Sequence, residues 1–182
     1  NNPNAYGTSA SDQFGNACSI SGNYAIVGAW LEDEDGQTSS GKAYVYKTTN
    51  GLWTDTTLYR TISNPNAYST VLNDGFAYKV GISGSYAAIG ATWEDDANGL
   101  GSGKAYIFNV ITGTLLATLD NPNAYGTSTD DGFHSVAISG NYLAVAAANE
   151  DDAGGTGSGK VYIYSLIDQT SSVTREELAA IL

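Results

Sequence analysis

One peptide, NPNAY, occurs three times in the chain, beginning at Asn2, Asn64 and Asn121. Each copy opens a repeated unit of about sixty residues: a polar stretch ending in Asp, a Phe, a short apolar run, an S-G-[NS]-Y turn, a second apolar run, an acidic loop, and S-G-K-[AV]-Y. Short apolar runs separated by turn signals predict four strands per unit. Such a repeat is typical of a β-propeller blade, which buries its faces by stacking on neighbouring blades.

We therefore predict an all-β fold of three four-stranded antiparallel blades. Residues 1–63 form the first blade, 64–120 the second, and 121–168 a third blade that lacks its outer strand. Residues 169–182 form a linker and a short C-terminal helix, because Thr174 and Glu177 make a capping-box pattern before Arg175–Leu182. The 22 glycines and 13 tyrosines are consistent with many tight turns and aromatic-rich strands.

The recurring NPNAY peptide reads as a corner between the last strand of one blade and the first strand of the next. Proline fixes φ and removes a hydrogen-bond donor, so it ends a strand, and the flanking asparagines can satisfy backbone groups of a turn. We expect Asn2-Pro3, Asn64-Pro65 and Asn121-Pro122 to be equivalent hinge turns without a ligand. The tyrosines of the peptide are expected to pin each corner onto the neighbouring blade: Tyr6, Tyr68 and Tyr125.

Two short motifs of the first unit, Phe14-Gly15 and Val27-Gly28-Ala29, resemble the FG-GAP repeat of integrin α-subunit propellers and of bacterial and viral surface proteins. The similarity covers about residues 2–166, and the SGKAYVY run is closest to the bacterial form. The amino-acid sequence of the repeats is also similar to repeats of virion structural proteins of marine tailed phages. The later units depart from the motif, with Phe76-Ala77, Phe133-His134 and Ala146-Ala147-Ala148.

The resemblance implies a non-enzymatic structural or adhesive protein, located extracellularly or on a virion surface, that mediates protein–protein or host-surface contacts. Three blades are too few for a closed propeller, which typically needs four to eight. Either further blades precede these, or two chains pair into a six-bladed ring, or the units stack in an open or three-fold arrangement. We expect completion by more blades or by oligomerisation, with other copies of the chain or other virion or surface proteins as partners, because exposed strand edges promote aggregation.

Acidic loops follow the second strand of every unit, and they are the candidate metal sites. Ca²⁺ takes several oxygen ligands from a tight glycine-containing loop, so Ca²⁺ is the candidate cofactor of these loops. In integrin-type repeats, however, the calcium loop precedes the VGA strand, where SGNY and SGSY offer no carboxylate here. The alternative is a solvated loop partly neutralised by Lys42, Lys104 or Lys160. The candidate ligands are Glu32, Asp33, Asp35, Glu94, Asp95, Asp96, Glu150, Asp151 and Asp152.

Trp30 and Trp93 lie between the second strand and the acidic loop, so they are expected on one rim. There they either pack together or form a ligand platform for glycans. A Ca²⁺-dependent glycan- or protein-binding module is therefore the alternative function, and a polysaccharide-acting hydrolase is the third. His134 lies near Ser135 and Asp131, but no nucleophile elbow exists and it occurs in one unit only, so we predict no enzyme.

Charge and hydropathy exclude two further classes of partner. The chain has 19 acidic against 7 basic residues, a net charge of −12. Nucleic-acid binding needs clustered Lys and Arg, so none is expected. No run approaches the roughly 20 apolar residues of a membrane span, so membrane insertion is not expected either. Cys18, the single cysteine, lies in a predicted strand and is expected to be a buried apolar residue.

Overall fold

The computed structural model describes residues 2–3, 11–33, 38–66, 73–96, 99–123 and 128–166, and within them the fold is all-β. Three antiparallel sheets follow one another in chain order. Sheet 1 contains β1 (Cys18–Ser21), β2 (Tyr24–Ala29), β3 (Lys42–Lys47) and β4 (Thr57–Ser63). Sheet 2 contains β5 (Phe76–Ser83), β6 (Tyr86–Ala91), β7 (Lys104–Asn109) and β8 (Thr114–Asp120). Sheet 3 contains β9 (Phe133–Ser139), β10 (Tyr142–Ala147) and β11 (Lys160–Ser165).

Each sheet is a meander in which neighbouring strands in the chain pair in the sheet. The first hairpin of every sheet closes through two residues, and its first turn residue is a glycine with positive φ: Gly22, Gly84 or Gly140. Glycine is favoured there because a Cβ disfavours the left-handed region. The predicted strand order is therefore confirmed. The described residues of sheet 3 contain three strands, and the expected lack of an outer strand in this blade stays a prediction, because residues 167–182 lie outside the described residues. The expected helix of 175–182 lies outside the described residues.

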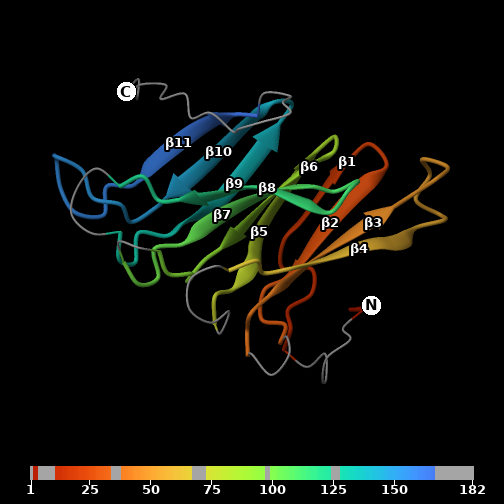
Figure 1. The fold of residues 1–182 in the computed structure, drawn as a ribbon, viewed down its shortest axis with the longest axis horizontal. Coiled ribbons are helices and arrows are strands. Elements are labelled where there is room, and N and C mark those ends of the chain that lie inside the picture. The colour runs from red at the N-terminus through yellow and green to blue at the C-terminus, as the bar shows by residue number, and fades with distance from the viewer. Residues whose placement is uncertain are drawn as a thin grey trace.

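The three sheets are stacked face to face in the order 1, 2, 3 (Figure 1). Two apolar cores fill the spaces between them, one between sheets 1 and 2 and one between sheets 2 and 3. We call the face of a sheet that points toward the next sheet its front face, and the opposite face its back face. In sheet 2, for example, Ala88 and Ile107 lie on the front face, whereas Ile89 and Tyr106 lie on the back face.

Neighbouring sheets approach each other very closely at one glycine of the second strand in sheets 1 and 2. A Cβ built on Gly28 would lie 2.2 Å from the carbonyl oxygen of Ala77, and one on Gly90 would lie 1.9 Å from that of His134. Ala77 and His134 directly follow the Phe that begins β5 and β9, where the strand pairing is irregular. The irregularity directs a backbone carbonyl at the preceding sheet, and only glycine leaves room for it.

The second and third Asn-Pro corners lie where they were predicted, after the last strand of one sheet and before the first strand of the next. The Asn64 side-chain oxygen accepts a hydrogen bond from the Asn66 amide (3.1 Å), and Asn121 does the same for Asn123 (3.2 Å). These are Asx turns, in which a side chain replaces a backbone acceptor. The prediction that asparagines satisfy the turn is confirmed for these two corners. Tyr6, Tyr68 and Tyr125 lie outside the described residues.

Candidate functional site

The acidic loops leave the ends of β2, β6 and β10, and the first acid of each loop points into the protein. Glu32, Glu94 and Glu150 are fully buried. Each accepts a hydrogen bond from the hydroxyl of the tyrosine two residues after the loop lysine: Tyr44, Tyr106 and Tyr162. The lysines Lys42, Lys104 and Lys160 lie 3.9, 3.4 and 2.9 Å from the same carboxylates. The predicted pairing of lysine with an acid of its own loop is confirmed.

The carboxylate of the middle blade is held in a strongly perturbed environment. Burial raises the pKa of Glu94 to about 7, with a further rise from the Asp74 carboxylate, against the lowering effects of Tyr106 and Lys104. Burial likewise raises the pKa of Asp74 to about 6, although Asn66 and Asn64 donate hydrogen bonds to it. Burial makes the charged form costly, and two nearby carboxylates add repulsion. The pair therefore titrates close to neutral pH.

The second acid of each loop closes the loop on itself. Asp33, Asp95 and Asp151 accept hydrogen bonds from the backbone N–H six residues later, at Ser39, Gly101 and Gly157. The distances are 2.8 to 2.9 Å. Asp96 and Asp152 accept hydrogen bonds within tighter turns. Asp96 accepts them from the Gly99 N–H and the Ser128 hydroxyl, and Asp152 accepts them from the Gly154 and Gly155 N–H groups. These carboxylates therefore act as turn acceptors in all three loops.

The second half of each of the first two loops binds the following sheet. Ser40 accepts a hydrogen bond from the Phe76 amide (3.1 Å), and Ser102 accepts one from the Phe133 amide (2.8 Å). The loop must therefore reach from the end of one second strand to the start of the next sheet. This requirement explains why the acidic loops of the first two units have the same length while the connection before the fourth strand varies.

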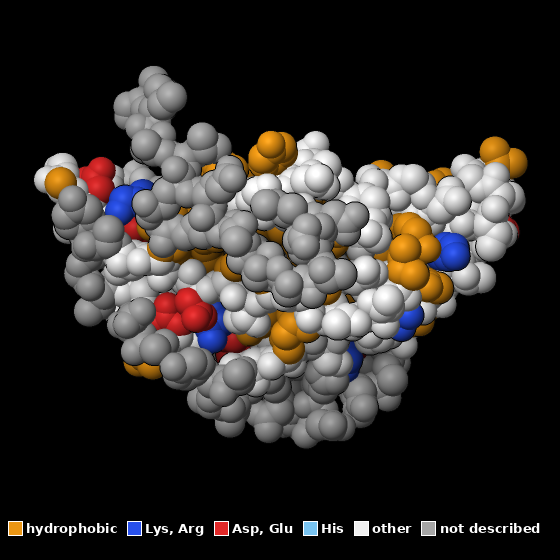
Figure 2. All heavy atoms as spheres, turned by 45° about the horizontal axis from the view of Figure 1, so that its top comes forward, with side chains coloured by type: hydrophobic (Ala, Val, Ile, Leu, Met, Phe, Trp, Pro, Cys, Tyr) orange, Lys and Arg blue, Asp and Glu red, His pale blue; other side chains and the backbone are white. Residues whose placement is uncertain are grey.

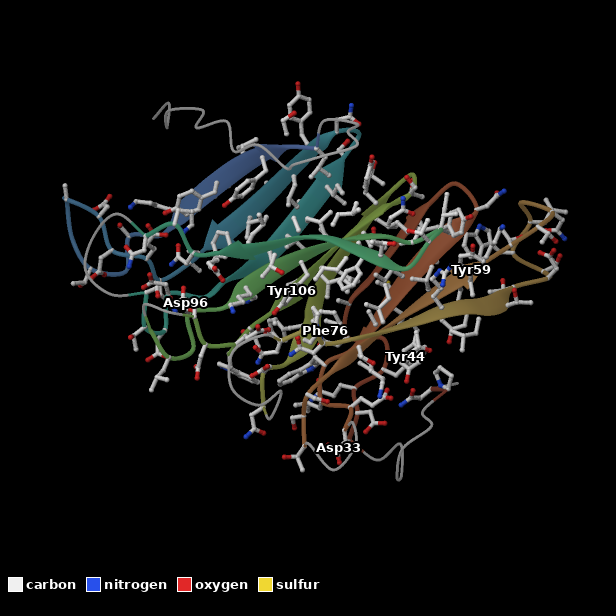
Figure 3. All side chains as sticks on the ribbon, viewed as in Figure 1. Asp33, Tyr44, Tyr59, Phe76, Asp96 and Tyr106 are labelled. Atoms are coloured by element: carbon white, nitrogen blue, oxygen red, sulfur yellow. The ribbon has the colours of Figure 1, made fainter. Side chains whose placement is uncertain are left out.

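The candidate metal ligands do not gather into one site. Within the described residues there is no group of three or more His, Cys, Asp or Glu side chains placed to hold a metal ion. The three glutamates point inward, the aspartates bind loop backbone, and Asp35 lies outside the described residues. On the face drawn in Figure 2, acidic side chains lie in small groups beside basic ones. Figure 3 shows Asp33 and Asp96 at the loops of different sheets. Calcium binding by these loops stays a prediction.

The two rim tryptophans lie together. The ring centroids of Trp30 and Trp93 are 5.0 Å apart, and the Tyr78 ring packs edge-on against Trp30 at 5.2 Å. Trp30 donates its indole N–H to Gln13 (3.0 Å), which fixes its orientation. Trp93 remains 48% exposed. Packing on the rim and a ligand platform are therefore compatible, and the ligand role stays a prediction.

His134 and its neighbours do not form a catalytic arrangement like that of a serine hydrolase. The His134 ring lies edge-on to Tyr78 at 5.3 Å, and its Nδ1 is buried without a hydrogen-bond partner. Burial, with a smaller effect of Lys79, lowers the pKa of His134 to about 4, so the ring is neutral at neutral pH. Asp131 instead accepts a hydrogen bond from Asn121 (2.8 Å). This histidine therefore has a structural position between two blades.

Sequence reasoning missed the aspartate that ends the polar stretch before each Phe. Asp12, Asp74 and Asp131 are buried, and the first asparagine of each corner donates to them at 2.7 to 2.8 Å. The signal was present, because this aspartate recurs in every unit at a constant distance from the asparagine. One prediction was wrong: Cys18 is exposed. It lies on the back face of sheet 1, where no preceding blade covers it in the described residues.

A comparison with protein families matches the chain to the FG-GAP repeat three times, at residues 4–46, 69–108 and 124–164. Together these matches span more than half of the chain, and each covers the first three strands of one sheet except the last residue of the third strand. A comparison with curated proteins found no match. Among the described residues no helix is long and apolar enough to cross a bilayer.

Proposed function

Because the chain belongs to the FG-GAP repeat family, we propose that it is a non-enzymatic interaction module displayed on a virion or another extracellular surface. FG-GAP repeats build β-propeller modules for protein–protein contact or adhesion, are generally non-enzymatic, and typically occur in extracellular or surface proteins. A structural or adhesive role on a virion is the more specific function that we propose for this chain, by extension from the contact and adhesion role of the family.

The observation that carries the proposal is the exposed aromatic surface on the rim. Trp93 is 48% exposed although its neighbours Trp30 and Tyr78 could have buried it. Leu100, in the acidic loop that follows Trp93, is also exposed. Tryptophan is enriched among the residues that dominate protein interfaces, because it offers a large rigid contact area. A partner protein is therefore expected to contact the rim formed by the acidic loops.

A site-specific photo-crosslinker tests this proposal on the particles or cells that naturally carry the chain. With the crosslinker at position 93, we expect an adduct with a protein of the same surface. The matched control is position 52, since Leu52 is also exposed, at 73%, but lies at the opposite end of sheet 1, in the β3–β4 turn. Adducts from position 52 alone, or reaction only after the particles or cells are lysed, would contradict the proposal.

Glycan recognition is the second candidate, and the same Trp93 favours it, because an exposed indole face can stack on a sugar ring. Binding to a glycan array, lost in Trp93→Ala and kept in Leu52→Ala, would support this candidate over a protein partner. Repeating the array with Ca²⁺ and with a chelator tests the calcium-dependent form. Binding that survives chelation would exclude a calcium requirement, and absence of binding in both conditions would exclude glycans on the array.

A further inference from the structure

The two internal interfaces are built from the same positions of the repeat. The front face of one sheet receives the back face of the next, so the contact is head-to-tail. On the front face of each of the first two sheets, one very close approach falls on a cross-strand pair of the smallest residues, Gly28–Ala43 in sheet 1 and Gly90–Ala105 in sheet 2. Ala43 and Ala105 are fully buried by the next sheet. A head-to-tail contact leaves one unused face at each end of such a row.

The back face of sheet 1, which no other described sheet covers, keeps the residues of a docking face. Ile20 holds the place of Ile82, and Cys18 that of Val80, by the register of the first hairpin. Ile82 is 4% exposed under sheet 1, whereas Ile20 is 61% exposed. Phe14 packs edge-on against Tyr44, as Phe76 packs against Tyr106. This face is therefore equivalent in side-chain type to the faces that dock inside the molecule.

The front face of sheet 3, which no other described sheet covers, differs at the cross-strand pair that lies closest to the next sheet in the internal interfaces. Ala146 and Val161 are cross-strand partners in the place of the Gly–Ala pairs. At this position in the internal interfaces a Cβ would lie about 2 Å from a backbone carbonyl, far inside contact distance. Val161 is 63% exposed and adds two methyl groups where the other sheets have a buried alanine. The pair is enlarged at both residues.

We propose that Ala146 and Val161 block a second copy of this chain from docking its sheet 1 on sheet 3. The back face of sheet 1 would present the Gly15 carbonyl, which holds the place of Ala77 and His134, to the Ala146 methyl group. Without this block the two end faces would match, and head-to-tail copies would form rings or open filaments. The pairing of two chains into a six-bladed ring needs the same contact, so it does not form in this register.

Restoring the small pair tests the proposal. We expect wild-type protein to sediment as a monomer at all concentrations and Ala146→Gly/Val161→Ala to gain mass as concentration rises. Adding Ile20→Lys to the double variant is expected to return it to the monomer, because it places a charge on the opposite docking face. The matched control is Ala144→Gly/Ile163→Ala, a cross-strand pair on the same front face outside the blocked position, which is expected to stay monomeric.

Two results would overturn the proposal: a folded double variant that stays monomeric, or a wild-type oligomer that Ile20→Lys disperses. A reciprocal variant keeps the test decisive even if the double variant misfolds. Gly90→Ala/Ala105→Val places the blocking pair inside the interface between sheets 2 and 3. We expect a clear fall in melting temperature, because the pair cannot fit against the His134 carbonyl. An unchanged melting temperature would show that this pair does not block docking.

Discussion

The residues that define each blade's polar interior are a glutamate, a lysine and a tyrosine under the acidic loop. The glutamate is fully buried in all three blades and accepts a hydrogen bond from the tyrosine. Taking these charges out of water is costly, and the geometry compensates with an ion pair and a hydroxyl donor on one carboxylate oxygen. The loop acids thus divide into one inward structural acid and aspartates that accept loop hydrogen bonds.

Replacing Glu94 should change how stability depends on pH. The folded-state pKa of Glu94 is raised to about 7, above its ordinary value of 4.5, so the folded protein binds more protons than the unfolded chain between these values. The stabilisation that Glu94 contributes to the folded protein is fully present below about pH 4.5 and is lost as the pH rises through about 7. Glu94→Gln should flatten the fall in unfolding free energy between pH 5 and 8, measured by urea titration.

Asp55→Asn is the control for this pH series, because hydrogen bonds from Thr48 and Thr49 lower the pKa of Asp55, so this carboxylate is ionised in both states between pH 5 and 8. It should leave the slope between pH 5 and 8 unchanged. A Glu94→Gln slope equal to that of wild type would show that Glu94 is already ionised across this range.

Ala77 has a positive φ of 68°, a conformation that L-residues other than Asn, Asp and Gly adopt at a cost of about 1–2 kcal/mol. Glycine at this position would relieve that strain, as in the Phe-Gly motif of the first blade. Ala87 is equally buried, but its φ is not positive. Both substitutions should lower the free energy of unfolding, and we expect the decrease for Ala77→Gly to be about 1–2 kcal/mol smaller than the decrease for Ala87→Gly. Equal losses in chemical denaturation would refute this assignment of strain.

At the scale of elements, the corner between sheets is a polar clamp. Asn64 and Asn66 both donate to Asp74, at 2.8 and 2.6 Å, and the clamp recurs with Asn121 and Asp131. The NPN peptide therefore ends one sheet and fastens the start of the next. Proline stops the strand, and the asparagines bind a buried carboxylate ten residues later.

Removing the clamp should destabilise the protein without changing its fold. Asn64→Ala leaves the buried Asp74 carboxylate with one donor fewer, for an expected loss of about 1–3 kcal/mol. Asn141→Ala, in the exposed turn between β9 and β10, is the control and should change stability by less than about 0.5 kcal/mol. Similar losses for both variants in a denaturant titration would contradict the clamp.

Much of the fold was predictable because three copies of one pattern define each element three times. Alternating apolar residues, the S-G turns and the Asn-Pro corners predicted the strand order, and the lysine was predicted to pair within its loop. The contacts between blades were not predictable. Nothing local indicates that Glu32 points inward, or that Ser40 binds Phe76 of the next sheet, since both depend on a neighbour far away in the sequence. Cys18 was misjudged for the same reason, because burial there requires a preceding blade.

At the scale of the whole molecule, stability comes from two copies of one head-to-tail interface. Figure 3 shows Phe76 and Tyr106 in the middle of the molecule, where sheet 2 meets sheet 1. In each interface the glycine of the second strand receives a backbone carbonyl from the next sheet. This contact gives the FG-GAP motif a physical meaning: the residue after Phe presents the carbonyl, and the later glycine makes room for it.

The most direct test of this account compares one methyl group at equivalent positions inside and outside an interface. Gly90→Ala should lower the unfolding free energy by about 1–3 kcal/mol or more, because its Cβ overlaps the His134 carbonyl. Ala146→Gly, on the unused front face of sheet 3, should cost less than about 1 kcal/mol. The measurement is urea unfolding of both variants. A Gly90→Ala protein as stable as wild type would contradict the stacking of blades described above.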